Sequence, residues 1–170
     1  MMRGAILLPL VILLLSGCGY RLQGRVDTLP GDVRYLYVEL FSNKTYEPFL
    51  ENSVTNEVVE RFARHRQLEI VEEPVRAEAI LGGRIVKYKN SALSYDRNDK
   101  TAEYRSRMTV RAELRRADNG EVLWKGTVSW REDYSTSRDK TVQEDREQAA
   151  IQGVSERVAD EIFSRVVDNF

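Results

Sequence analysis

A long run of alternating polar and apolar residues, 101–117, constrains the fold of this chain more than any other feature. Side chains of a β-strand point alternately to its two faces, so the run predicts a strand with one face in the core and one in water. The wet face carries mainly arginines. The other face carries Tyr104, Ser106, Met108, Val110, Ala112 and Leu114.

The residues that follow this run predict a β-hairpin. Ala-Asp-Asn-Gly at 117–120 is typical of a tight turn in which Asn and Gly adopt positive φ angles. Residues 121–134 then alternate again, with Gly126 among the apolar positions. The apolar face of this second strand is expected to hold Val122, Trp124, Val128 and Trp130.

Two other segments have the spacing of amphipathic helices. The first helix is expected from Pro48 to about Arg66, and the second from the capping-box spacing Thr-Val-Gln-Glu at 141–144 to nearly Phe170. Apolar residues recur every three or four positions in both. They are Leu50, Val54, Val58 and Phe62 in the first segment, and Ile151, Val154, Val158, Ile162 and Val166 in the second.

Three further segments predict strands because they are rich in β-branched and aromatic residues: 33–40, 68–71 and 79–96. The first of these should place Leu36, Val38 and Leu40 on one face, and Ser-Asn-Lys-Thr at 42–45 should form a loop after it. Gly82 and Gly83 interrupt the alternation of the third segment, so we expect a β-bulge there.

This order of elements predicts an α+β fold. Two amphipathic helices and a predominantly antiparallel or mixed sheet with one apolar face bury their apolar surfaces best as a two-layer sandwich, with both helices packed on one face. A chain of 170 residues is within the size of one domain, so residues 33–170 are expected to form a single domain.

The N-terminus has the pattern of a targeting segment. A positive start is followed by an apolar stretch of 11 residues, 5–15, which is too short to cross a bilayer as a helix. Leu-Ser-Gly-Cys at 15–18 resembles the lipobox of bacterial lipoproteins. This resemblance implies that residues 1–17 are a signal peptide, that Cys18 receives S-diacylglycerol and an N-acyl chain, and that 18–32 is a lipidated tether.

The lipid anchor explains why the chain has one cysteine and no disulfide partner for it. An ordinary secretory leader with an incidental free cysteine and an uncleaved membrane helix are the alternatives. The residue after the cysteine is Gly19, whereas lipoproteins retained in the inner membrane commonly have Asp at this position. The resemblance therefore favours the periplasmic side of the outer membrane.

Composition and motifs exclude several classes of function. A formal net charge of −1 argues against a protein that binds nucleic acid through bulk positive charge. We expect no enzyme, because an acylated Cys18 leaves no nucleophile–histidine set, and His65 is expected to lie at a solvated helix terminus. No metal site is expected and, apart from the covalent lipid, no cofactor.

The one candidate site that sequence reasoning finds is a cluster of cations on two loops. If the strands run antiparallel, loops 96–101 and 135–140 lie at the same end of the sheet. Their cations are Arg97, Lys100, Arg138 and Lys140.

Converging guanidinium and ammonium groups suit phosphate or carboxylate ligands. Surface ion pairs with Asp96, Asp99 and Asp139 of the same loops are the alternative. The arginine stripe of residues 105–115 is likewise either a solvated face or a partner surface.

Several of these segments together resemble the LptE family of lipopolysaccharide-assembly lipoproteins: Ser-Gly-Cys-Gly-Tyr, the strand after Leu-Pro-Gly, Arg-Asn-Asp-Lys-Thr-Ala-Glu-Tyr-Arg-Ser-Arg-Met-Thr-Val and the two flanking helices. The resemblance implies an outer-membrane lipoprotein that plugs and stabilises the LptD β-barrel. It also implies lipopolysaccharide binding through basic side chains, and Arg97 and either Arg138 or Lys140 match where such residues fall. With Lys100 from the loop argument, the candidates are Arg97, Lys100, Arg138 and Lys140. A scaffolding lipoprotein of another envelope complex, with no glycolipid binding, is the alternative.

Overall fold

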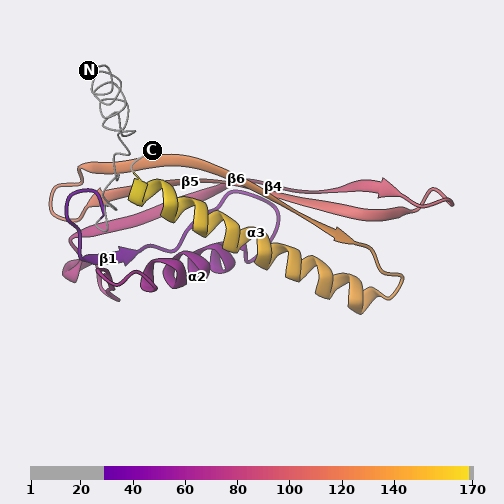
Figure 1. Ribbon diagram of the computed structural model, residues 1–170, viewed down its shortest axis with the longest axis horizontal. Helices are drawn as coiled ribbons and strands as arrows, with labels where there is room; N and C mark the ends of the chain where they lie inside the picture. Colours follow the sequence, from indigo (N-terminus) through magenta and orange to yellow (C-terminus); the bar gives the residue numbers. More distant parts are fainter. Residues whose placement is uncertain (1–28, 169–170) are drawn as a thin grey trace, which may run out of the picture.

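The computed structural model describes residues 29–168, so the predicted signal peptide of residues 1–17, Cys18 and most of the tether lie outside the described residues. The described chain is a two-layer α+β sandwich, as predicted. Figure 1 shows long strands forming one layer and two helices lying on one face of them.

The sheet has six strands and is mixed. Its main order is β3-β1-β4-β5-β6, and β2 also pairs with β4. The pairs β4–β5 and β5–β6 are antiparallel, whereas β1 and β2 run parallel to β4 and β1 runs parallel to β3. The strands are β1 (Tyr35–Val38), β2 (Ser42–Asn43), β3 (Glu69–Ile70), β4 (Ala79–Tyr95), β5 (Thr101–Arg116) and β6 (Val122–Ser135), and a short 3-10 helix, η1, spans Pro74–Arg76.

The predicted alternation is confirmed in β5 from Ser106 to Leu114, whereas Tyr104 is only partly buried. Ser106, Met108, Val110, Ala112 and Leu114 are buried. The apolar face predicted for β6 is confirmed only in part: Trp124 and Val128 are buried, but Trp130 and Val122 are exposed. Val122 pairs with Arg115 beyond a register shift. β6 is an edge strand of this sheet, so its side chains have a neighbouring strand on one side only.

The turn between β5 and β6 differs from the predicted one. Gly120 has a positive φ of 73°, but Asn119 does not have a positive φ. Instead, the Asn119 side-chain oxygen accepts a hydrogen bond from the backbone N–H of Glu121 at 2.9 Å. The asparagine therefore stabilises the turn through its side chain.

The bulge predicted at Gly82 and Gly83 is wrong. These glycines pair in regular register with Glu113 and Ala112, and the register shifts between Ile85 and Lys87 instead. A Cβ on Gly83 would lie 2.5 Å from the Phe41 ring and 2.6 Å from a backbone carbonyl oxygen of β5. The glycine serves close packing of Phe41 onto the sheet.

The segment after β1 also differs from expectation. Leu36 and Val38 are buried as predicted, but Leu40 is exposed and Phe41 is buried. The alternation ends because the regular strand stops at Val38, and the chain then forms the two-residue strand β2 where a loop was expected.

The two helices are α2 (Leu50–Ala63), which ends three residues before the predicted Arg66, and α3 (Lys140–Asp168). Every apolar position predicted to face the core is buried in both. The two helices also pack against each other, and the rings of Phe62 and Phe163 meet edge to face with centroids 5.1 Å apart.

The start of α3 is not the predicted capping box. Asp139 is the N-cap: its carboxylate oxygen accepts hydrogen bonds from the N–H groups of Thr141 (2.9 Å) and Val142 (3.2 Å). Gln143 reaches back to accept one from the N–H of Ser137 at 2.9 Å. The helix therefore begins at Lys140, and Thr141 is already inside it.

Candidate functional site

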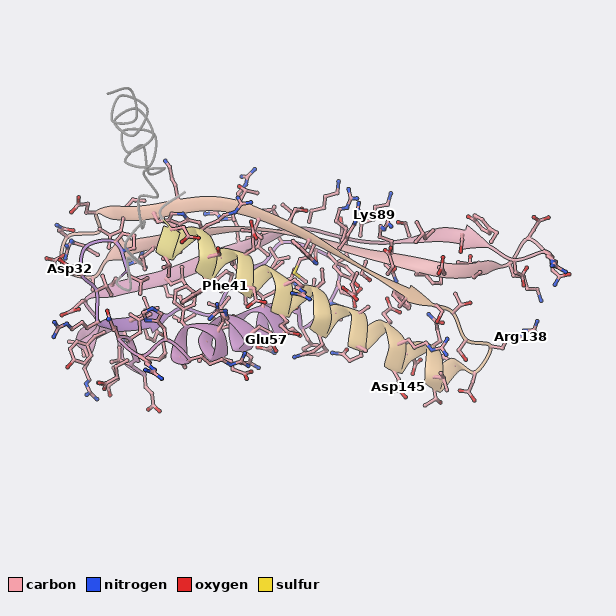
Figure 2. All side chains as sticks on the ribbon, viewed as in Figure 1. Asp32, Phe41, Glu57, Lys89, Arg138 and Asp145 are labelled. Atoms are coloured by element: carbon pink, nitrogen blue, oxygen red, sulfur yellow. The ribbon has the colours of Figure 1, made fainter. Side chains whose placement is uncertain are left out.

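Both predicted loops border one cleft of about 720 Å³ at the end of the sheet. The β4–β5 turn contributes Lys100 to its lining, and the loop between β6 and α3 contributes Arg138. Figure 2 labels Arg138 in this loop, ahead of the first turn of α3. Two cations that are 38 residues apart in the sequence thus line the same cleft.

The β4–β5 turn is built around Asp96. Its carboxylate oxygen accepts hydrogen bonds from the N–H groups of Asn98 (2.8 Å) and Lys100 (3.0 Å), and Asp99 takes a positive φ of 56°. Both hydrogen bonds lower the pKa of Asp96, and the one from the Lys100 N–H has the larger effect. This carboxylate therefore holds the turn that presents Lys100.

The second loop is fixed to β5 and to α3. Thr136 donates from its N–H to the Ala102 carbonyl (2.9 Å) and from its hydroxyl to the Thr101 carbonyl (3.0 Å). Arg146 of α3 donates to the carbonyl of Ser135 at 3.1 Å. Arg138 thus follows a loop segment anchored on both sides.

The other two predicted cations do not line the cleft. Arg97 is exposed in the β4–β5 turn. Lys140 has a side chain that is 90% exposed and lies 3.7 Å from the carboxylate of Glu144, one turn further along α3. Of the four predicted cations, the structure brings Lys100 and Arg138 to the cleft.

Two of the acidic side chains in these loops accept hydrogen bonds from backbone N–H groups, and the charge of Lys100 also helps to lower the pKa of Asp96. Asp96 binds backbone N–H groups of its own turn, and Asp139 caps α3. Within residues 29–168, no carboxylate lies within ion-pair distance of Lys100 or Arg138, although Asp96 and Asp99 also line the cleft.

Sequence reasoning missed the aromatic and amide groups of the cleft. Tyr104 and Tyr134 are cross-strand partners with stacked rings whose centroids lie 5.7 Å apart. The Asn90 amide donates to the Tyr134 hydroxyl (2.6 Å) and to the Glu147 carboxylate (2.8 Å), while burial raises the pKa of Tyr134. The Tyr pair could have been found from the hairpin register.

This lining combines cations with hydroxyl, amide, carboxylate and aromatic groups: Asn90, Asp96, Asp99, Lys100, Thr101, Tyr104, Tyr134, Thr136, Ser137, Arg138, Gln143 and Glu147. Hydroxyl and amide groups can bind sugar hydroxyls, and Arg and Lys can bind phosphate. The cleft therefore suits a polar ligand that carries both.

His65 lies just beyond α2, but its ring packs against Phe163 at a centroid distance of 5.6 Å and is only partly exposed, unlike the solvated histidine that we expected. Residues 29–168 contain no group of three His, Cys, Asp or Glu side chains arranged to hold a metal ion. Among these residues, no helix has the length and apolar character needed to span a membrane.

Comparison with protein-family models identifies the relationship. The model described as "LptE: Lipopolysaccharide-assembly" matches residues 33–166, which include every strand and all but the end of α3. This chain belongs to the LptE family. As a member it is a lipopolysaccharide-assembly lipoprotein, and the family resemblance seen in the sequence is confirmed.

Solved structures share the fold of this LptE-family chain at low sequence identity. Rare lipoprotein B from Shewanella oneidensis is 19% identical, with a TM-score of 0.56, and the alignment covers 80% of this chain and 96% of that one. Lipoprotein B from Nitrosomonas europaea is 17% identical, with a TM-score of 0.56 and coverage of 88% and 90%. Among curated protein sequences, none matches this chain at a significant level.

Proposed function

We propose that this LptE-family chain is a non-enzymatic outer-membrane lipoprotein that plugs and stabilises an LptD-like β-barrel and binds lipopolysaccharide during assembly. The family match over residues 33–166 carries this proposal. The fold supports the plug role, because the outer face of the sheet is polar, as suits the water-lined interior of a large barrel.

The cleft at the end of the sheet supports the lipopolysaccharide role. Lys100 and Arg138 supply positive charge for the phosphates of the glycolipid, and Tyr134, Asn90 and Gln143 supply hydrogen-bonding groups for its sugars. Arg97 and Lys140 are exposed nearby and add to the positive field without lining the cleft. Lipopolysaccharide phosphates and core sugars are therefore the proposed ligand.

The proposed location rests on the N-terminal sequence. Acyl chains on Cys18 would anchor the domain to the inner leaflet of the outer membrane through the tether of residues 18–32. Mass spectrometry of the membrane-extracted protein should give a chain that starts at Cys18 and carries a diacylglycerol and one further acyl group. An unmodified thiol at this position would refute the anchor.

Copurification tests the barrel partner. The tagged full-length chain, extracted in mild detergent, should bring down a large outer-membrane β-barrel protein at a fixed ratio. A chain isolated alone under these conditions would contradict the plug role.

Direct binding to purified lipopolysaccharide separates this proposal from the scaffolding alternative. The proposal expects saturable binding that weakens with added salt, because the contacts involve phosphate and cations. A scaffolding lipoprotein of another envelope complex would show no binding in the same assay.

A further inference from the structure

The face of the sheet that points away from both helices carries seven exposed cations without an ion-pair partner within residues 29–168. Six of them occupy three consecutive rows, and the seventh, Lys125, lies opposite Glu113 in the next row. Within residues 29–168, no carboxylate oxygen lies within ion-pair distance of any of them. Figure 2 shows one of them, Lys89, on the side of the sheet opposite α3. We call the six cations of the three rows the basic face: Arg84, Lys87, Lys89, Arg107, Arg111 and Arg131.

The strand register places these like charges directly opposite one another. Lys89 of β4 is the partner of Arg107 in β5, which is in turn the partner of Arg131 in β6. Two rows further along the strands, Arg84 of β4 is the partner of Arg111 in β5. Like charges in directly opposed positions destabilise a sheet, so the basic face weakens the isolated domain.

Arginines at the two borders of the same face are paired. Arg105 binds Asp133 at 2.6 Å through a side-chain hydrogen bond, and Arg115 binds Glu39 at 2.6 Å. The sheet thus has carboxylates at its borders, where Asp133 also attracts Arg131, and has none directly opposite the six cations of the three rows. This contrast distinguishes the basic face from an ordinary solvated surface.

The excess of positive charge lies in this layer. The two helices on the other side carry ten acidic and five basic residues, and the whole chain has a formal net charge of only −1. The domain therefore has one positive side and one negative side, which favours one orientation in an asymmetric electrostatic environment.

The chemistry of the basic face favours a broad acidic protein surface. Its three rows extend about 13 Å along the strands and about 10 Å across them. Thr109, Thr127 and Ser129 occupy the positions between the cations, and the hydroxyl of Thr109 hydrogen-bonds that of Ser129 at 3.1 Å. These rows hold no apolar side chain that could bind an acyl chain.

We infer that the basic face docks against acidic side chains of the barrel wall and so sets the orientation of this domain inside its partner. The inference rests on the proposed plug function, because it names the surface through which the plug meets the barrel. Carboxylates of the partner would then supply the compensation that the sheet itself lacks in rows such as Lys89–Arg107–Arg131.

Neutralisation of one row tests the inference in the full-length, barrel-bound protein. The test variant carries Lys89→Gln, Arg107→Gln and Arg131→Gln. The control variant carries Arg66→Gln, Arg76→Gln and Arg157→Gln and so loses the same amount of positive charge. These three arginines are exposed on other surfaces and likewise have no ion-pair partner within residues 29–168.

The affinity of each purified variant for the barrel protein is measured in detergent at about 50 mM and about 500 mM salt. The test variant should bind at least tenfold more weakly than the unsubstituted chain at low salt, with a smaller difference at high salt, and the control should change less than threefold. Relief of like-charge repulsion should also raise the unfolding midpoint of the free test variant by about 2 °C or more.

Equal barrel affinity of the test and control variants would overturn the inference alone. Unchanged barrel affinity with lost binding to lipopolysaccharide micelles would also overturn it, and would assign the basic face to glycolipid phosphates. Failure of the unsubstituted chain to bind any barrel would overturn the proposed function, and the inference with it.

Discussion

The covered end of the sheet and the cleft end differ in what holds them together. The covered end comprises residues 79–85, 106–114, 122–128 and 150–166, and it contains buried side chains from every one of these segments. The cleft end comprises residues 86–105 and 129–149, and none of these residues is buried. The same three strands run through both ends.

Hydrogen bonds take the place of apolar burial at the cleft end. Asn90, Tyr134 and Glu147 are linked through the Asn90 amide, and Thr136 is bonded twice to carbonyls of β5. A net hydrogen bond contributes about 1 kcal/mol, whereas a large buried side chain contributes several. Folding therefore depends mainly on the covered end, which leaves the cleft end open to substitution.

Removal of a core ring should have the largest effect. Phe62 is fully buried and packs on Phe163, so Phe62→Ala should lower the free energy of unfolding by about 3–5 kcal/mol, through lost burial and the cavity that remains. Denaturant titration measures this loss. A loss below about 1.5 kcal/mol would break the distinction between the two ends.

A methyl group on Gly83 should have the next largest effect. The new Cβ of Gly83→Ala would meet the Phe41 ring and a β5 carbonyl at 2.5–2.6 Å, so overpacking should cost about 1–3 kcal/mol of unfolding free energy.

Gly153→Ala is the matched control for Gly83→Ala. Gly153 lies within α3, and the nearest atoms to its new Cβ would be 3.6 Å away. Because Ala favours helix more than Gly does, this variant should gain up to about 1 kcal/mol. Equal effects of the two substitutions on the unfolding midpoint would show that Gly83 does not serve close packing.

Loss of the polar link at the cleft end should be smaller. Asn90→Ala removes the hydrogen bonds to Tyr134 and Glu147 and should lower the free energy of unfolding by about 1 kcal/mol. The same denaturant titration applies. A cost as large as that of Phe62→Ala would mean that the cleft end is part of the folding core.

Acid should have the smallest effect, through the Arg105–Asp133 pair at the border of the basic face. The hydrogen bond from Arg105, the largest cause, and the positive charges nearby lower the pKa of Asp133 below its ordinary 3.8. The folded protein therefore binds this proton less readily than the unfolded chain. The contribution of the pair is present above about pH 3.8 and is lost as the pH falls through the lower, folded pKa.

Thermal unfolding of the wild type and Asp133→Asn as a function of pH checks this. The difference between their midpoints should shrink as the pH falls below 3.8. A difference between the midpoints that stays constant down to the lowest pH would show that the ionised carboxylate of Asp133 does not contribute to stability.

The sequence was sufficient to predict the elements that depend on apolar periodicity. Every apolar position predicted on the helices is buried, and the alternation of β5 holds because a strand with one buried face must alternate. The hairpin register then placed both loops at one end. The predicted bulge failed because the local geometry depends on a distant partner: Gly83 accommodates Phe41. The predicted start of α3 failed for a local reason, because Asp139, two residues before Thr141, caps the helix.

The candidate site could be predicted only to the level of the loops. The sequence shows that Arg97, Lys100, Arg138 and Lys140 lie in them, but the direction of each side chain depends on the Asp96 turn and on the helix start. Asn90 escaped notice because the register shift between Ile85 and Lys87 changes which β4 residues face the cleft.

The affinity for purified lipopolysaccharide, measured for two double variants of equal charge change, tests the central claim most directly. Lys100→Glu with Arg138→Glu reverses the two cations that line the cleft, whereas Arg97→Glu with Lys140→Glu reverses the two that do not. All four side chains lie at the cleft end, so both variants should unfold within about 2 °C of the wild type. We expect at least a tenfold weaker affinity for the first variant and less than a threefold change for the second. Unchanged affinity in the first variant, or an equal loss in both, would contradict a lipopolysaccharide site in this cleft.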